Sequence, residues 1–208
     1  MIPINDPRIE KYLMRLAVDE DAQLREMERI AKQKSFPIVD RLVGRLLFLL
    51  AKMKNPKLVV ELGSGFGYSA YWFARAMSRG KVVLTDHSAE NIGYAQAVFK
   101  DAGMTRRAVF HTGDAVKIAR QYHSIDILFV DIDKHQYVEA VQAVKPHLAK
   151  DALIIADNTL WYGKVAGRHR DRDTEGIRRF NDMMFSSPDF FSCIVPLRDG
   201  VLLSQRLS

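Results

Sequence analysis

The stretch ELGSGFGYSA (residues 61–70) follows the apolar run LVV and precedes the helix-like segment YWFARAM. Its three glycines at alternate positions allow the backbone to turn tightly and to approach a ligand closely. A dinucleotide-binding fingerprint, G-x-G-x-x-G, needs its third glycine at position 68, where this chain has Tyr68. The loop is also preceded by Glu61, and a carboxylate there disfavours a pyrophosphate and favours a positively charged ligand such as a sulfonium. The loop therefore predicts a cofactor site at the end of a strand.

From residue 58 onward, short apolar runs alternate with helix-like segments. The runs that we expect to be strands cover residues 58–62, 81–86, 107–112, 125–131 and 152–157. The helices expected between them cover residues 68–78, 89–102, 114–122 and 135–149. This alternation is typical of right-handed βαβ units and of a mostly parallel sheet with helices on both faces.

The two ends of the chain depart from this alternation. Residues 190–197 and 200–207 read as strands joined by a tight turn, so the last strand is expected to run antiparallel to its neighbour. In the first third, the apolar spacing predicts helices over residues 9–18, 21–33 and 38–53. The stripe expected on the third of these helices consists of Val39, Leu42, Leu46, Leu50 and Met53.

The predicted fold class is therefore α/β, with a Rossmann-like sheet of seven strands that is mostly parallel and has an antiparallel last strand. Helices on both faces and extra N-terminal helices complete the layout, which is that of a class I S-adenosylmethionine (SAM) methyltransferase. A dinucleotide-binding domain would more commonly continue with another parallel strand. We expect a single domain over residues 1–208, in which residues 1–55 form helices that cover the site and residues 56–208 form the α/β core.

The composition, 48% apolar and 27% charged, is that of a globular chain. The N-terminus lacks the pattern of a secretory signal, and the longest apolar patch is too short to cross a bilayer, so we expect a cytoplasmic protein without a membrane partner. The net charge of +6 permits attraction to nucleic acid or to an acidic small molecule. The densest basic cluster is Lys164, Arg168, His169, Arg170, Arg172, Arg178 and Arg179.

Acidic residues stand at the ends of three successive predicted strands. After Glu61, Asp86 closes the second strand, where a carboxylate can accept hydrogen bonds from both hydroxyls of a ribose. Asp114 follows the third strand and can accept a hydrogen bond from an adenine amino group. Asp86 and Asp114 have an equally simple structural interpretation as helix N-caps.

Two further strand ends carry the segments LFVDIDKHQY (residues 128–137) and IIADNTLWYG (residues 154–163). The carboxylates of Asp131 and Asp157 should converge there, with Asn158 beside the second. Two carboxylates and an amide oxygen suit Mg²⁺, Mn²⁺ or Ca²⁺ and suit zinc poorly. Lys134 enters the next helix, and a lysine beside a bound cation loses its proton more readily and can act as a base. The alternative interpretation is a set of helix caps with a surface lysine.

The order of these motifs over nearly the whole chain resembles the metal-dependent O-methyltransferases related to catechol and caffeoyl-CoA O-methyltransferases, bacterial members above all. The motifs that carry the resemblance are ELGSGFGYSA, GDA, FVDIDKHQY, DNTLWYGKV, RRFN and RDGVLL. One departure is Ile132, which stands where the family usually has alanine. A second is the extra glycine, Gly65, in the loop.

The resemblance implies a role for each residue of the candidate site. The implied SAM-binding residues are Val39, Glu61, Gly63 and Ser69 at the methionine end, Asp86 at the ribose, Asp114 and Ala115 at the adenine, and Asp131. The implied metal ligands are Asp131, Asp157 and Asn158, and Lys134 acts with Asp131 in catalysis.

The activity implied is SAM-dependent, divalent-metal-dependent methylation of a small catechol-like or phenolic hydroxyl, including that of a CoA ester, with Mg²⁺ as the expected metal and Mn²⁺ or Ca²⁺ as alternatives. A homodimer is expected from the same resemblance. An RNA or ribosomal methyltransferase is the alternative that the net charge favours, although methylation of a base does not need the metal ligands. Two rival interpretations are a nicotinamide oxidoreductase and a SAM-binding protein without turnover.

Overall fold

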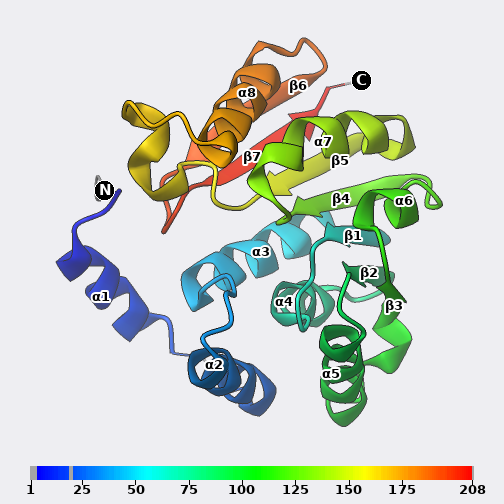
Figure 1. Cartoon of the computed structure of the whole chain (residues 1–208). Coiled ribbons are helices and arrows are strands. Elements are labelled where there is room, and N and C mark those ends of the chain that lie inside the picture. The colour runs from blue at the N-terminus through cyan, green and yellow to red at the C-terminus, as the bar shows by residue number, and fades with distance from the viewer. Residues whose placement is uncertain (1–3, 19–20, 208) are drawn as a thin grey trace.

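A seven-stranded sheet forms the centre of the computed structural model, which describes residues 4–18 and 21–207. The strands lie in the order β3-β2-β1-β4-β5-β7-β6 (Figure 1). The first five strands pair in parallel, whereas β7 runs antiparallel to both β5 and β6, as the sequence predicted. Residues 1–3, 19–20 and 208, which the expected domain includes, lie outside the described residues. The strands are β1 (Leu58–Leu62), β2 (Lys81–Asp86), β3 (Ala108–Thr112), β4 (Ile125–Val130), β5 (Leu148–Ala156), β6 (Phe190–Val195) and β7 (Val201–Arg206).

Helices cover both faces of this sheet (Figure 1). Successive strand residues such as Val59 and Val60 point to opposite faces and both are buried, which explains why the strands are apolar throughout. The helices α3, α4 and α5 pack on one face, and α6, α7 and α8 pack on the other. None of the described helices is long and apolar enough to cross a membrane. The α-helices are α1 (Pro7–Leu16), α2 (Ala22–Lys34), α3 (Arg41–Lys54), α4 (Tyr68–Ala76), α5 (Ala89–Asp101), α6 (Ala115–Ala119), α7 (Tyr137–Val144) and α8 (Arg172–Ser186). The 3₁₀ turns are η1 (Thr105–Arg107), η2 (Lys134–Gln136), η3 (Lys145–His147) and η4 (Trp161–Ala166).

The third helix begins later than predicted and buries a different face. It begins at Arg41 because Asp40 caps it, accepting a hydrogen bond from the Val43 N–H at 3.0 Å. Its buried residues are Val43, Gly44, Leu47 and Ala51. Met53, which the predicted stripe included, is 83% exposed. The rotation of α3 is set by its close approach to α4, because a Cβ atom at Gly44 would overlap the Trp72 ring, and apolar spacing alone does not reveal this contact.

The helix predicted over residues 135–149 is also shorter in the structure. It consists of η2, α7 and η3, and β5 already begins at Leu148. Pro146 lies within η3, and a proline interrupts helical hydrogen bonding because it has no N–H group.

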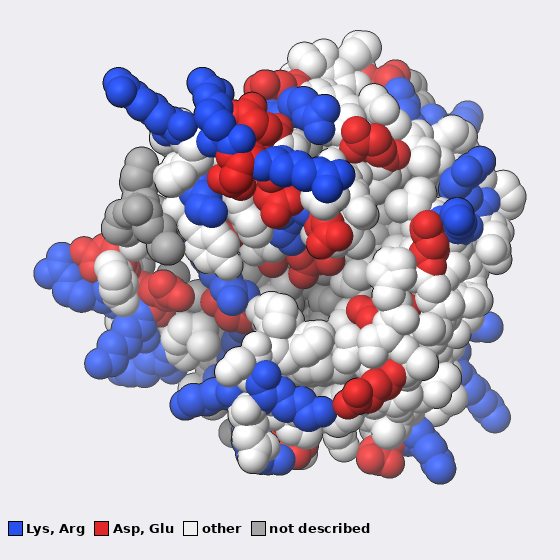
Figure 2. Space-filling view, viewed as in Figure 1, with Lys and Arg blue, Asp and Glu red and all other residues white. Residues whose placement is uncertain are grey.

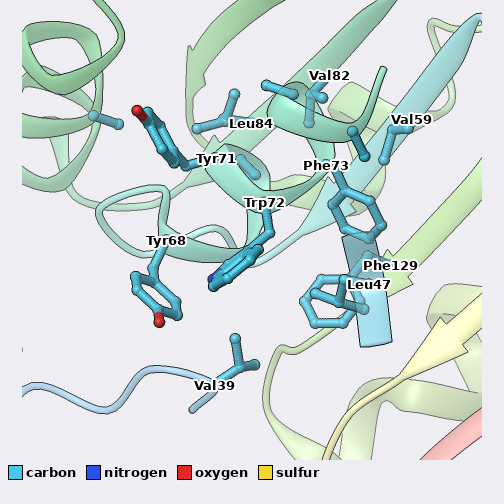
Figure 3. Packing of buried hydrophobic residues seen from close by; sticks show 14 of the residues in the cluster. Val39, Leu47, Val59, Tyr68, Tyr71, Trp72, Phe73, Val82, Leu84 and Phe129 are labelled. Atoms are coloured by element: carbon cyan, nitrogen blue, oxygen red, sulfur yellow. The ribbon is translucent and has the colours of Figure 1, made fainter. Parts of the chain in front are cut away.

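Tyr68, the residue that replaces the third glycine of the dinucleotide fingerprint, has a structural role. It is 2% exposed, and its hydroxyl donates a hydrogen bond to Glu28 Oε1 at 2.6 Å. Glu28 also forms an ion pair with Arg41, so Tyr68 joins the start of α4 to both α2 and α3. Figure 3 shows Tyr68 and Trp72 lying on the side of α4 that faces Val39. The N-terminal helices are thereby fixed beside the glycine loop.

Gly176 provides a test of how α8 positions the loop after β4. A Cβ atom at this position would lie 2.5 Å from His135 Cα and 2.9 Å from the Lys134 carbonyl oxygen. Gly176→Ala is therefore expected to lower the free energy of unfolding by roughly 2 kcal/mol through overpacking and to displace η2. Urea denaturation and the turnover number measure the two effects.

The matched control for that variant is Gly93→Ala in α5, because a Cβ atom there would have no neighbour within 4 Å. Higher helix propensity should raise the stability of this control by up to about 1 kcal/mol. Equal behaviour of the two variants would show that the packing of α8 against η2 is not tight.

Candidate functional site

A cavity of about 910 Å³ opens at the carboxyl ends of the parallel strands. Figure 2 shows the corresponding face of the molecule hollowed at its centre, with acidic side chains inside the hollow. Two segments that are distant in sequence contribute to its wall, namely residues 36–39 before α3 and the 3₁₀ turn η4. Every site residue predicted from the sequence lines this cavity except Glu61: Val39, Gly63, Ser69, Asp86, Asp114, Ala115, Asp131, Lys134, Asp157 and Asn158.

Contacts with the end of β4 and with β2 fix the backbone of the glycine loop. Gly63 has a φ of +82°, in the left-handed region that favours glycine, and a Cβ atom there would overlap the Asp131 carbonyl oxygen. Ser64 ties the loop to β2, because its N–H donates to the Thr85 carbonyl oxygen at 2.8 Å and its hydroxyl accepts from the Thr85 N–H at 3.0 Å. The loop therefore presents a fixed backbone to the cavity.

Glu61 lies beneath this loop and is completely buried. Burial raises the pKa of its carboxyl group to about 8, and the nearby Ser64 and Ser69 hydroxyls oppose only part of that rise. Among the described residues, none donates a hydrogen bond of good geometry to either carboxylate oxygen. A buried carboxyl group without partners is costly, which is consistent with a group that meets a cationic ligand or a water molecule.

The interpretation as helix N-caps is confirmed for Asp114 and is wrong for Asp86, because α5 is capped by Ser88. Asp86 Oδ1 accepts hydrogen bonds from the Ser88 N–H at 2.8 Å and from Asn91 Nδ2 at 3.1 Å. Asp114 caps α6 by accepting from the Lys117 N–H at 2.9 Å. Both residues also line the cavity, so each carboxylate is held in place by the chain and faces the space that a ligand would fill.

Lys134 is held in one position beside the cavity. It is 8% exposed, and its Nζ donates to Asp131 Oδ1 at 2.7 Å and to the Ile132 carbonyl oxygen at 3.1 Å. The ammonium group also lies 5.2 Å from the centre of the Tyr137 ring and 5.8 Å from that of Trp161. The lysine is therefore an inward-facing cation rather than a surface residue.

Asp157 and Asn158 supply further oxygen atoms at the end of β5. Asp157 is 2% exposed, and its Oδ1 has no hydrogen-bond partner among the described residues. Burial raises the pKa of this carboxyl group, and the nearby Asp131 carboxylate raises it further. Two acidic groups that repel each other and an unpaired buried oxygen fit a hard divalent cation, whose charge would remove both penalties. A cluster of three His, Cys, Asp or Glu residues is not found in the described chain, so the third ligand of such an ion would be the Asn158 amide oxygen.

Asp199 is a site residue that the sequence analysis missed. It is 5% exposed, and its carboxylate accepts hydrogen bonds from Asn158 Nδ2 at 3.3 Å and from the Tyr162 N–H. Burial raises the pKa of this carboxyl group. Asp199 orients the Asn158 amide, as carboxylates placed behind metal ligands commonly do. The only signal in the sequence was its place in the turn before the last strand.

The segment after β5, which brings Trp161 beside Lys134, has an unusual backbone. Asn158, Trp161 and Tyr162 have φ values of 58°, 46° and 55°, which residues other than glycine rarely adopt. Trp161 and Tyr162 both line the cavity and give its wall an aromatic surface. Phe180, from α8, is buried in the core against Tyr137 and does not contribute to it.

The basic cluster around residues 164–179 does not line the cavity within the described chain. Arg178 donates hydrogen bonds to four carbonyl oxygens of the preceding loop, those of Lys164, Val165, Gly167 and His169. Arg178 and Arg170 also form ion pairs with Glu175. These arginines hold the loop together, so their density in the sequence is explained without an anionic ligand.

The strand order, the antiparallel β7 and the cavity beyond the strand ends define a class I SAM-dependent methyltransferase. Within that class, the chain belongs to the O-methyltransferase family, whose model matches residues 14–207. The resemblance to catechol and caffeoyl-CoA O-methyltransferases that the sequence motifs indicated is thereby confirmed.

One curated relative and two solved structures illustrate the similarity. The catechol O-methyltransferase of Niastella koreensis is 33% identical over 148 residues, which cover 68% of this chain and 67% of the relative. A methyltransferase from Geobacter sulfurreducens is 41% identical with a TM-score of 0.88, and both chains are covered completely. TomG of Streptomyces achromogenes, an O-methyltransferase involved in tomaymycin synthesis and solved in complex with SAM, is 25% identical with a TM-score of 0.87, and 97% of this chain and 96% of TomG are covered.

Proposed function

We propose that the protein transfers the methyl group of SAM to a hydroxyl of a small catechol or phenol, with a divalent cation held by Asp131, Asp157 and Asn158. One observation carries this proposal: these three residues and Lys134 line the same cavity as the glycine loop and Asp86. The complex of TomG with SAM supports the assignment of the cofactor. Mg²⁺ is the metal that we propose, because the donors are oxygen atoms and water can complete its coordination.

The cofactor half of the cavity suits SAM in charge and shape. The backbone at Gly63 and the side chain of Ser69 would contact the methionine part, and Glu61 beneath the loop would favour the positive sulfonium. Asp86 would accept hydrogen bonds from the ribose hydroxyls, and Asp114 with Ala115 would contact the adenine. SAM supplies an activated methyl group, so the sulfur–methyl bond breaks as the oxygen–methyl bond forms.

In the acceptor half, the residues would align a hydroxyl oxygen with that methyl group and remove its proton. A bound divalent cation supplies Lewis acidity that lowers the pKa of the hydroxyl. Lys134 would accept the proton at Nζ, which the Ile132 carbonyl oxygen holds near the cavity. Lys134 Nζ lies 2.7 Å from Asp131 Oδ1, so the proposed base is in direct contact with a residue that would hold the cation. Trp161 would form a flat wall beside the aromatic ring of the acceptor.

Methyl transfer to a panel of catechols and monophenols, with and without a chelator, tests this function. We expect turnover of catechols with SAM, loss of activity on chelation and recovery on adding Mg²⁺. Adding Mn²⁺ or Ca²⁺ to the chelated protein instead shows how much activity each alternative metal restores. Catechol methylation that survives complete chelation would contradict the role of the cation, and SAM binding without turnover of any acceptor would contradict the activity itself.

A further inference from the structure

Arg198 lines the cavity, and the proposed reaction does not use it. It lies in the turn between β6 and β7, directly before Asp199, the residue that orients Asn158. Its Nη1 donates a hydrogen bond of 2.6 Å to the Ile38 carbonyl oxygen, on the segment before α3. The guanidinium group is therefore anchored at one nitrogen across the mouth of the cavity, next to the proposed metal ligands.

Arg198 is close enough to the Asp157 and Asp199 carboxyl groups to lower the pKa of both, but it is not paired with either in the described chain. Lys134 and Arg198 are the Lys and Arg residues of the cavity wall in the described chain, and Lys134 is paired with Asp131 at 2.7 Å. Arg198 forms no ion pair with any described carboxylate. Its backbone φ of 50° lies in the left-handed region, which an arginine adopts only at a cost of roughly 1 kcal/mol. An exposed, half-anchored arginine in a strained turn is well suited to bind an anion.

Most of the acidic groups that line the cavity have other assigned partners, and the exceptions, Asp133 and Glu139, are exposed to solvent. Asp86 and Asp114 line the cofactor half, and Asp131 and Asp157 face the proposed cation. Asp173 accepts a hydrogen bond from the His135 N–H at 3.2 Å and lies 2.9 Å from His135 Nδ1, so its carboxylate already has a partner in η2. Among the described Lys and Arg residues that line the cavity, Arg198 is thus the one that no carboxylate pairs with.

We infer that Arg198 forms a carboxylate-binding subsite and that the acceptor is an aromatic acid, with its hydroxyl groups at Asn158 and its carboxylate at the guanidinium group. This inference rests on the proposed function, because it names the class of acceptor for the same reaction. It assigns acceptor selectivity to the turn between β6 and β7 instead of to the basic cluster of residues 164–179.

The test compares two acceptors that differ in charge and little in shape, 3,4-dihydroxybenzoate and its methyl ester. The wild type is expected to have the higher kcat/KM for the acid. In Arg198→Gln, the ratio of kcat/KM for the acid to that for the ester should fall about tenfold or more, as expected for loss of a hydrogen bond to a charged group. Arg198→Lys keeps the charge and should restore part of the ratio. Arg79→Gln removes the same charge from an exposed position before β2 and should leave the ratio as in the wild type.

Different results would contradict the carboxylate subsite and the methyltransferase activity. If both acceptors are methylated and Arg198→Gln changes them equally, Arg198 has only a structural role and the carboxylate subsite is wrong, while the methyltransferase activity stands. A selective rise in the KM for SAM would also overturn the inference, because Arg198 would then bind the carboxylate of the cofactor. If neither acceptor is methylated by the wild type in the presence of SAM and Mg²⁺, the catechol activity itself is contradicted.

Discussion

Asp157→Asn is expected to lower kcat by at least about 1,000-fold. A loss of this size corresponds to about 4 kcal/mol of transition-state stabilisation. The substitution keeps the shape of the side chain but removes a charge from the proposed cation site. It should also raise the melting temperature of the metal-free protein at pH 8, because burial makes the charged carboxylate of Asp157 unfavourable. A loss of activity together with a gain in stability cannot result from misfolding. Methyl transfer and thermal unfolding measured on the same preparation give both results.

The control for this variant is Asp133→Asn, which removes the same charge from an exposed position in the loop after β4. Asp133 also lines the cavity, but its side chain does not cap η2. We expect kcat to change by less than about threefold there, since exposed charges contribute little. If Asp157→Asn remained nearly as active as this control, the role of Asp157 as a metal ligand would be untenable.

The second large effect concerns Glu61 and the dependence of stability on pH. Its pKa is about 8 in the folded protein, whereas the ordinary pKa of a glutamate side chain is 4.5. Above pH 4.5 the unfolded chain releases this proton while the folded chain retains it, so the stability of the ligand-free protein should fall as the pH rises to 8 and level off beyond it. The upper bound on this contribution is about 5 kcal/mol, from a shift of about 3.5 pH units.

Glu61→Gln should remove most of that dependence. Urea denaturation of the variant and the wild type at pH 5, 7 and 9 isolates the part due to Glu61, because other buried acids such as Asp157 contribute equally to both proteins. At pH 9, where Glu61 is charged, the variant should also bind SAM about tenfold more weakly, since it lacks the negative charge beneath the sulfonium site. Parallel stability curves for the two proteins would show that Glu61 does not retain its proton on folding.

The positions of site residues could be predicted best from the sequence where those residues lie at the ends of strands. Parallel strands place their carboxyl ends at one edge of the sheet, so Asp86, Asp131 and Asp157 could be brought together from the strand pattern alone. Residues whose position depends on packing between distant segments could not be predicted in this way. Asp199 reaches Asn158 only because β7 pairs with β5, and Arg198 reaches Ile38 across 160 residues of sequence.

Errors in the predicted elements have similar causes. The start of α3 is set by the cap at Asp40, and its rotation is set by the contact of Gly44 with Trp72. Apolar spacing describes neither effect, because it contains no information on the capping side chain or on how closely a neighbouring helix approaches. The role of the basic cluster could not be predicted for a different reason: its charge is visible in the sequence, but the hydrogen bonds of Arg178 to backbone carbonyl oxygens are not.

The left-handed backbone of the loop after β5 has a consequence for directed evolution. Asn158, Trp161 and Tyr162 each hold a conformation that costs on the order of 1 kcal/mol for a residue with a Cβ atom. Glycine at position 161 or 162 would relieve the strain but remove the aromatic wall. Selection for heat resistance alone would therefore favour substitutions here that erode acceptor recognition, so a library built to stabilise this protein should leave these three positions unchanged.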